Sequence, residues 1–177
     1  MFEIEHRAVL TEAEHSALEA ALTSRAQLLG TDDKKVGYYI FPDKLLKVVH
    51  NISRGDAKLS LKLTALGEGS AFKELEVPFA EGSIETMKEI CDLITCPQQV
   101  IWGTQKRTNY ELEGVEIALK WSEDWGHHVE FEIVVPDLAE KDAADERIKD
   151  VAQSLAVTLM TEEEVAAFSA KARAARK

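Results

Sequence analysis

Pairs of glutamates separated by a single residue occur three times in stretches whose composition favours β-strand. Side chains two positions apart on a strand point to the same face, about 6.6 Å apart along it, so each pair places two carboxylates side by side. Apolar residues fill the alternate positions and give each strand an apolar opposite face. Carboxylate oxygens are ligands that hard divalent cations prefer. The three pairs are Glu3 and Glu5, Glu74 and Glu76, and Glu130 and Glu132.

The same alternation also fits a simpler structure. An antiparallel strand with one solvated face alternates apolar and charged residues in this way. This acidic chain carries similar pairs at Glu111 and Glu113, and at Glu12 and Glu14. The pairs alone therefore leave two interpretations open, a metal-binding lining and an ordinary solvated face.

Basic residues alternate in the neighbouring predicted strands. Lys58 and Lys62 share one face of their strand with Ser60. A mixed acidic and basic lining suits a polyphosphate, because basic groups bind phosphoryl oxygens while carboxylates hold a divalent metal ion. A closed antiparallel barrel is one way to enclose such a ligand, and a β-sandwich with ordinary polar faces is the alternative. In the barrel, the interior contains the six paired glutamates, Glu116, and the basic residues Arg7, Lys47, Lys58, Lys62, Arg107 and Lys120.

The predicted elements follow the order β-α-β-β-β-β-α, then a three-stranded meander and two helices. The first strand carries Glu3 to Arg7. Clean alternation or turn residues at the ends indicate the other seven strands. They lie near residues 35–41, 45–52, 57–64, 72–79, 99–112, 115–121 and 128–135.

Four helices are predicted, and the starts of three of them are marked by residues that cap helices. The first runs from Thr11 to Gly30, and the second covers residues 84–95. Two more lie between residues 138 and 177, and a turn is predicted at residues 67–69. The candidate caps are Thr11 with Glu14, Ser83, and Thr161 with Glu164.

Composition fits one compact domain over residues 1–177, because this length allows a substantial core and 45% of the residues are hydrophobic. The formal net charge of −11 disfavours binding to a nucleic-acid duplex or an anionic membrane. It leaves room for a small anionic ligand in a locally basic cavity. Cys91 and Cys96 are too few for a zinc site or a disulfide framework. No signal peptide or membrane-spanning segment is recognised, so a soluble cytoplasmic protein is expected.

The ordered motifs of residues 2–135 resemble the CYTH domain, also called the triphosphate tunnel metalloenzyme family. Members open with Glu-x-Glu-x-Lys, which residues 3–7 match with Arg7 in place of Lys. Their central Glu-x-Glu matches residues 74–76, and their Arg-x-x-Tyr matches residues 107–110. Their closing Gly and Glu-x-Glu match Gly126 and residues 130–132.

The resemblance implies an α+β fold, an antiparallel eight-stranded β-barrel or tunnel over residues 1–135 with flanking helices, including those of residues 136–177. It also implies a Mg²⁺- or Mn²⁺-dependent hydrolase of a triphosphate compound, namely inorganic tripolyphosphate, thiamine triphosphate or a nucleoside triphosphate. Glu3, Glu5, Lys62 and Arg107 are the expected catalytic residues. The expected metal ligands are Glu3, Glu5, Glu74, Glu76, Glu130 and Glu132, and the expected substrate contacts are Arg7, Lys47, Lys58, Lys62, Arg107 and Lys120.

Three departures from the family pattern bear on activity. Val49 replaces the second Arg of an Arg-x-Arg element, Gln105 stands where Lys is frequent, and Lys120 stands where a metal-binding Asp is usual. They favour the alternative of a catalytically divergent module that binds a phosphorylated ligand or a protein partner. Adenylyl cyclase is a variant within the enzyme class. The substrate, the metal and the choice between monomer and homodimer stay open.

Two weaker signals lie beside the last glutamate pair. His128 shares a strand face with Glu130, and a structural role is favoured over metal binding. Trp121 and Trp125 flank a loop, where core packing is favoured over stacking on an organic ring.

Overall fold

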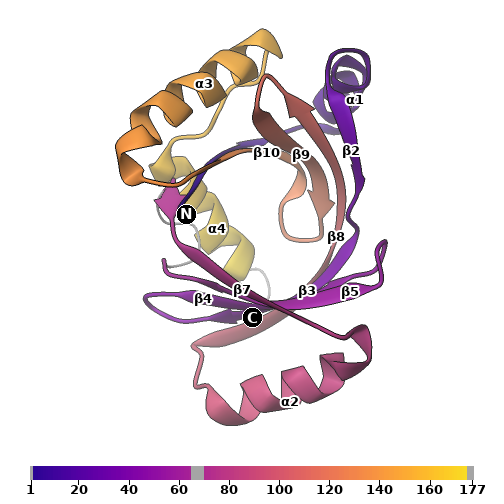
Figure 1. Ribbon diagram of the computed structural model, residues 1–177, viewed down its shortest axis with the longest axis vertical. Helices are drawn as coiled ribbons and strands as arrows, with labels where there is room; N and C mark the ends of the chain where they lie inside the picture. The colour runs from indigo at the N-terminus through magenta and orange to yellow at the C-terminus, as the bar shows by residue number, and fades with distance from the viewer. Residues whose placement is uncertain (1, 65–69, 175–177) are drawn as a thin grey trace.

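The computed structural model describes residues 2–64 and 70–174. Its strands form one antiparallel sheet in the order β6-β1-β10-β9-β8-β3-β4-β5-β7, with β2 paired to β8. The sheet curls into a nearly closed barrel (Figure 1). Its strands are β1 (Phe2–Val9), β2 (Gln27–Thr31), β3 (Lys34–Ile40), β4 (Leu45–Asn51), β5 (Asp56–Lys62), β6 (Ala71–Phe72), β7 (Glu74–Phe79), β8 (Gln99–Leu112), β9 (Val115–Ser122) and β10 (Gly126–Val135).

Closure of the barrel depends on the short stretch that joins β6 to β7. Phe72 of β6 pairs with Glu3 of β1, and Glu74 at the start of β7 pairs with Lys62 of β5. A hydrogen bond of 2.8 Å from the Glu5 amide to the Ser70 carbonyl adds a further link across this seam. The two edges of the sheet are thereby joined, and the α+β barrel fold expected from the sequence is confirmed.

The described sheet has ten strands rather than the expected eight. The helix predicted to reach Gly30 ends at Arg25, because residues 27–31 find hydrogen-bonding partners on the long strand β8. Gly30 lies at an irregularity in this pairing, with φ of +123°, a conformation that glycine adopts easily. The tenth strand arises because the predicted strand 72–79 divides at Lys73 into β6 and β7. Tertiary partners override local preference in both places.

The helices are α1 (Glu12–Arg25), α2 (Ile84–Ile94), α3 (Lys141–Ser154) and α4 (Glu162–Ala174), with short 3₁₀ turns η1 (Glu81–Ser83) and η2 (Leu138–Glu140). The capping boxes at Thr11 and Thr161 are confirmed by their hydrogen bonds to Glu14 and Glu164. Ser83 makes no capping hydrogen bond, so that prediction is wrong, since the η1 turn already leads the chain into α2. The turn predicted at residues 67–69 lies outside the described residues.

The main apolar core lies outside the barrel wall, between the strands and the covering helices. Ile4, Ile117 and Phe131 point outward and pack with Leu22 of α1 and Ile148 of α3. Each such side chain contributes about 1.5–3 kcal/mol of burial. On the opposite side, α2 packs against β4 through Cys91 and Val48 (Figure 1). The helices thus cover the apolar faces of β1, β9 and β10 and part of β4, and the charged side chains of these strands line the interior.

The last helix has a different position. Met160, just before α4, donates its amide to the Arg7 carbonyl at 2.8 Å. Ser169 and Ala172 of α4 then line the barrel interior, and the helix reaches across part of the opening seen in Figure 1. None of the described helices is long and apolar enough to cross a membrane.

Candidate functional site

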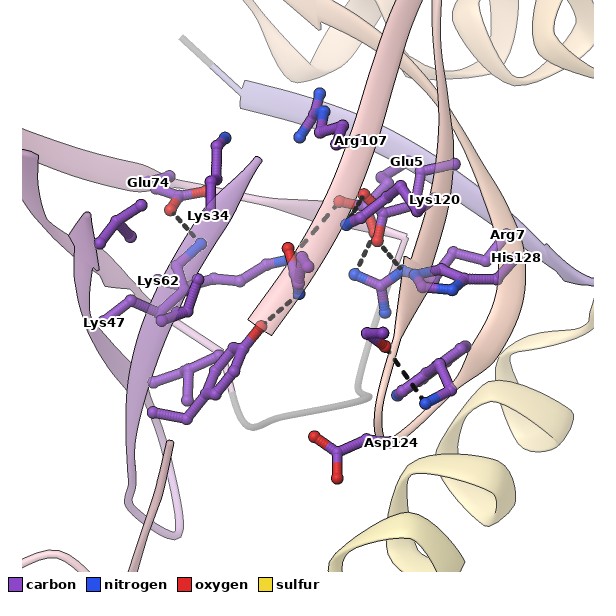
Figure 2. Close-up of a pocket in the computed structure, with 18 of the residues that line it drawn as sticks. Glu5, Arg7, Lys34, Lys47, Lys62, Glu74, Arg107, Lys120, Asp124 and His128 are labelled. Atoms are coloured by element: carbon purple, nitrogen blue, oxygen red, sulfur yellow. Dashed lines mark hydrogen bonds and ion pairs between the residues drawn. The ribbon is translucent and has the colours of Figure 1, made fainter. Parts of the chain in front are cut away.

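The barrel encloses a cavity of about 410 Å³, within the range of about 300–1,000 Å³ typical of ligand sites. The structure places every predicted site side chain on the wall of this one cavity. They are Glu3, Glu5, Glu74, Glu76, Glu130 and Glu132, with Glu116, and the basic residues Arg7, Lys47, Lys58, Lys62, Arg107 and Lys120. Figure 2 shows Glu5, Arg7 and Lys120 facing Lys47 and Lys62 across the interior. Their chemical roles stay predictions.

A trio of carboxylates from β1 and β10 forms the most acidic part of the wall. Oxygens of Glu3, Glu5 and Glu132 all lie within 4.8 Å of one another. Burial, reinforced by the neighbouring carboxylates of Glu132 and Glu74, raises the pKa of Glu3 to about 9. Burial and the charge of Glu5 raise the pKa of Glu132 to about 7. The hard oxygens of the trio suit a divalent cation, which would replace the protons that the raised pKa values of Glu3 and Glu132 indicate.

Glu130 is not part of this trio and has two cationic partners, of which Arg7 also pairs with Glu5 of the trio. The Glu130 carboxylate accepts hydrogen bonds from Lys120 Nζ at 2.8 Å and Arg7 Nε at 3.2 Å. Burial raises the pKa of Glu130, but the charges of Lys120 and Arg7 outweigh it and hold the pKa well below its usual value. Glu130 is therefore ionised, and its negative charge is already balanced by Lys120 and Arg7. Lys120 itself is buried, with 6% of its surface exposed.

The central glutamate pair contacts basic side chains of β4 and β5. Glu74 forms an ion pair of 2.6 Å with Lys47 and accepts a hydrogen bond from Ser60. Although burial raises the pKa of Glu74, Lys47 lowers it to about 2. Glu76 pairs with Lys58 where the side chains are more exposed. In this arrangement the pair orients the lysines.

The two remaining cations of the predicted set, Lys62 and Arg107, are each held at the cavity wall by neighbouring side chains of the wall. Lys62 Nζ lies 3.8 Å from Glu5, and burial lowers the pKa of Lys62 to about 8 although Glu5 opposes the shift. Arg107 donates to Glu116 at 3.0 Å and also contacts Asn109. Positively charged hydrogen-bond donors therefore line the part of the cavity next to the carboxylate trio.

Several residues that line the cavity were not predicted from the sequence. Lys34 forms an ion pair of 2.5 Å with the buried Asp32, and burial together with the charge of Arg107 lowers the pKa of Lys34 to about 8. Extending the alternation of Val36 and Tyr38 by one step would have found Lys34, because the predicted strand began one residue late. Asp32 follows β2, which was predicted as helix. Ser169 carries no local signal, since α4 reaches the cavity only through tertiary packing.

The structure also locates the two weaker candidates. His128 is buried, and burial together with Lys120 lowers its pKa to about 4, which keeps its ring neutral at pH 7. Its Nδ1 lies 2.9 Å from the Gly126 carbonyl. Trp125 packs against Phe168 of α4 with ring centroids 4.8 Å apart and also lines the cavity.

No family model and no curated protein matches this sequence. Solved structures do match. The PH1012 protein from Pyrococcus horikoshii is 23% identical, covers 92% of this chain and 93% of its own, and gives a TM-score of 0.72. A putative adenylate cyclase from Vibrio parahaemolyticus is 17% identical, with coverage of 89% and 90% and a TM-score of 0.69.

A third match is HpAC1 from Hippeastrum, described as a putative adenylyl cyclase with a dominant triphosphatase activity. It is 16% identical, with coverage of 89% of each chain and a TM-score of 0.58. At these identities the likeness establishes the fold. The chain therefore has the CYTH or triphosphate tunnel fold, and this prediction from the sequence is confirmed.

Proposed function

We propose that this protein hydrolyses a triphosphate compound inside the barrel with the help of a divalent metal ion. The observation that carries the proposal is a single cavity in which a trio of carboxylates adjoins a ring of buried and half-buried cations. The dominant triphosphatase activity described for the Hippeastrum protein, which shares the fold, supports it.

The basic side chains account for recognition of the phosphate chain. Arg107 is held by Glu116 through one terminal nitrogen, and its planar group has further donors for phosphoryl oxygens. Lys62 lies close to Glu5 and so brings a cation beside the carboxylate trio. Hydrogen bonds between charged groups are shorter and stronger than neutral ones, so this lining favours a highly charged anion over a neutral ligand.

Glu3, Glu5 and Glu132 are the residues that would hold Mg²⁺ or Mn²⁺. When bound, such an ion polarises a phosphoryl oxygen and neutralises charge that develops during attack. Glu130 is engaged by Lys120 and Arg7, and Glu74 by Lys47. These two glutamates position cations for the substrate and are not part of the trio.

The reaction is the transfer of a phosphoryl group to water. A water oxygen forms a bond to the terminal phosphorus, and the bond from that phosphorus to the bridging oxygen breaks. The bridging oxygen leaves with the electron pair as part of the diphosphate product, and the proton lost by the attacking water passes to solvent. Arg107 and Lys62 stabilise the negative charge on the transferred group and the leaving group.

A phosphate-release assay tests the proposal. Tripolyphosphate, ATP and thiamine triphosphate are each supplied with Mg²⁺ or Mn²⁺, and the ATP reaction is also assayed for cyclic AMP. Arg107→Ala is expected to lower kcat/KM by about 10- to 100-fold, because a hydrogen bond to a charged group contributes about 1.5–3 kcal/mol. Arg54→Ala, in an exposed ion pair with Asp56, is the matched control and should leave the rate unchanged. Absence of metal-dependent phosphate release from every compound would refute the proposal.

A second candidate function is binding of a phosphorylated ligand without turnover. The ion pair between Lys120 and Glu130 favours it, because an ammonium occupies space beside a carboxylate that a metal ion would otherwise use. The distinguishing result is a tripolyphosphate-induced rise in melting temperature, lost in Arg107→Ala, without release of phosphate.

A further inference from the structure

We propose that His15 of α1 and His127 of β10 form a second metal site, on the outside of the barrel, for a transition-metal ion of the class of Ni²⁺, Cu²⁺ and Zn²⁺. Neither histidine lines the cavity. The inference therefore goes beyond the proposed function and does not depend on it. The outer site takes a different class of ion from the interior, because imidazole suits these transition metals whereas carboxylates suit Mg²⁺ and Mn²⁺.

His127 belongs to the outward-facing row of β10. Side chains alternate between the two faces of a strand, and Val129 and Phe131 of the same row are buried in the core outside the barrel wall. His128, the next residue along, lines the cavity instead. His127 therefore points toward the layer of helices. Leu10, just before α1, donates its amide to the His127 carbonyl at 2.9 Å, which holds the start of α1 against this end of β10.

His15 lies on the side of α1 that packs against the barrel. Leu18 and Leu22 follow it on the same helical face, and both leucines belong to the core shared with β10. The ring of His15 thereby meets the ring of His127, with centroids 4.5 Å apart and planes inclined by 60°. Two imidazoles from different elements are thus fixed side by side by the packing of α1.

The ring of His127 has a buried nitrogen that lacks a partner. Its Nδ1 is shielded from solvent, yet among residues 2–64 and 70–174 no group forms a hydrogen bond with it. Buried polar atoms of side chains nearly always have a partner, and an unsatisfied one costs about 1–3 kcal/mol. A histidine that serves only to fill the core gains nothing from this arrangement. A metal ion bound to the nitrogen would satisfy it.

The distance between the rings fits coordination of one ion by both. With metal–nitrogen bonds of about 2.0–2.1 Å, two imidazoles on one ion have centroids about 4.5 Å apart at the right angles of tetragonal Ni²⁺ or Cu²⁺ and about 5 Å apart at the tetrahedral angles of Zn²⁺. The observed separation of 4.5 Å agrees with the first value. His15 is half-buried, so its ring has room to turn toward the ion.

The other coordination positions are open. Within the described part of the chain, the glutamate trio is the one group of three His, Cys, Asp or Glu side chains whose ligand atoms lie within 4.8 Å of one another. A third side chain is therefore not already placed beside the two histidines. Glu19 lies one turn beyond His15 on α1 and is exposed, so its carboxylate can reach the ion, and water fills the rest. Such an ion would join α1 to β10 and stabilise the folded protein.

Calorimetric titration with Ni²⁺ tests the inference, at a pH about one unit above the ordinary histidine pKa. Excess Mg²⁺ is present, and the titration is repeated in Glu5→Gln, so that the carboxylate trio does not contribute. His15→Gln and His127→Gln are each expected to weaken Ni²⁺ binding by at least about tenfold, since loss of even an outer partner of a metal ligand costs about 10- to 100-fold. His50→Gln, which removes a histidine paired with Glu81, is the matched control and should bind Ni²⁺ like the unaltered protein.

A measurement on the unaltered protein makes the test independent of how the variants fold. Ni²⁺ is paramagnetic, so a small amount is expected to broaden the NMR signals of the His15 and His127 rings and to leave those of the His50 ring sharp. Equal Ni²⁺ affinity in all the histidine variants, with unaltered circular dichroism spectra, would overturn the inference. Broadening confined to other residues would do the same, and would leave the His127 nitrogen to a water molecule.

Discussion

Replacing Lys120 by Met is expected to lower the free energy of unfolding by about 2 kcal/mol. Loss of one partner from a buried ion pair costs about 3–5 kcal/mol when the other charge is left alone. Lys120 and Glu130 are such a pair, with side chains 7% and 12% exposed and the two atoms 2.8 Å apart.

Two features of the site reduce this cost below the general range. Arg7 stays 3.2 Å from Glu130 and keeps it partly compensated. Removal of Lys120 also relieves its repulsion with Arg107 and Arg7, charges that act together with burial to lower the pKa of Lys120. With a slope of about 2 kcal/mol per molar urea, a loss of about 2 kcal/mol moves the midpoint by about 1 M.

Urea denaturation followed by circular dichroism measures the effect. Lys106→Met, an exposed position on β8, is the control and should move the midpoint little. The double variant Lys120→Met with Glu130→Gln removes both charges, so it should recover most of the lost stability. A midpoint for Lys120→Met equal to that of the control, or a double variant with the summed loss of the two single variants, would refute the reasoning.

Further predictions concern the trio and the fold. In metal-free protein the pKa values of Glu3 and Glu132, about 9 and about 7, lie above the ordinary value of 4.5. These two groups make the folded protein bind more protons than the unfolded chain, so urea titrations should show stability falling as the pH rises from about 5 to 8, above which the lowered pKa values of Lys34 and Lys62 oppose the fall. A rise over this range would contradict the pKa shifts, and Glu132→Gln should flatten the slope near pH 7. Glu5→Gln should weaken Mn²⁺ binding by about tenfold or more in calorimetric titration, since it removes one charged ligand; unchanged affinity would place the ion elsewhere. Gly37→Ala would press a methyl group into the ring of Trp102 and should cost about 1–3 kcal/mol in thermal unfolding, whereas Gly82→Ala, with open space around it, should not.

Local patterns in the sequence specified much of the wall of the site. The period of two along a strand places Glu3 beside Glu5, and Lys58 on the same face as Lys62, whatever the rest of the chain does. The capping boxes at Thr11 and Thr161 are likewise complete within four residues, and the structure contains both. The barrel was predicted from the order of the motifs, because the family resemblance indicated that strand faces far apart in the chain share one interior.

Contacts between distant residues decided the rest. Strands β1 and β10 pair residues more than a hundred positions apart, such as Arg7 with Glu130, and this pairing brings one of its two cationic partners to Glu130. Because Lys120 stands where the motif usually has a metal-binding Asp, it was expected to disturb a metal site. Only the structure shows that its ammonium contacts Glu130, while the oxygens of Glu3, Glu5 and Glu132 cluster together and Arg7 joins Glu5 to Glu130.

The end of the cavity at α4 depended on tertiary structure throughout. Ser169 lies in an Ala-rich helix whose sequence carries no sign of a ligand contact. It reaches the interior because residues before α4 bond to β1 and Phe168 packs on Trp125. Strand alternation and helix caps are local properties that a short stretch of sequence determines. The side chains that share a cavity are set by closure of the barrel, which requires pairing along the whole chain.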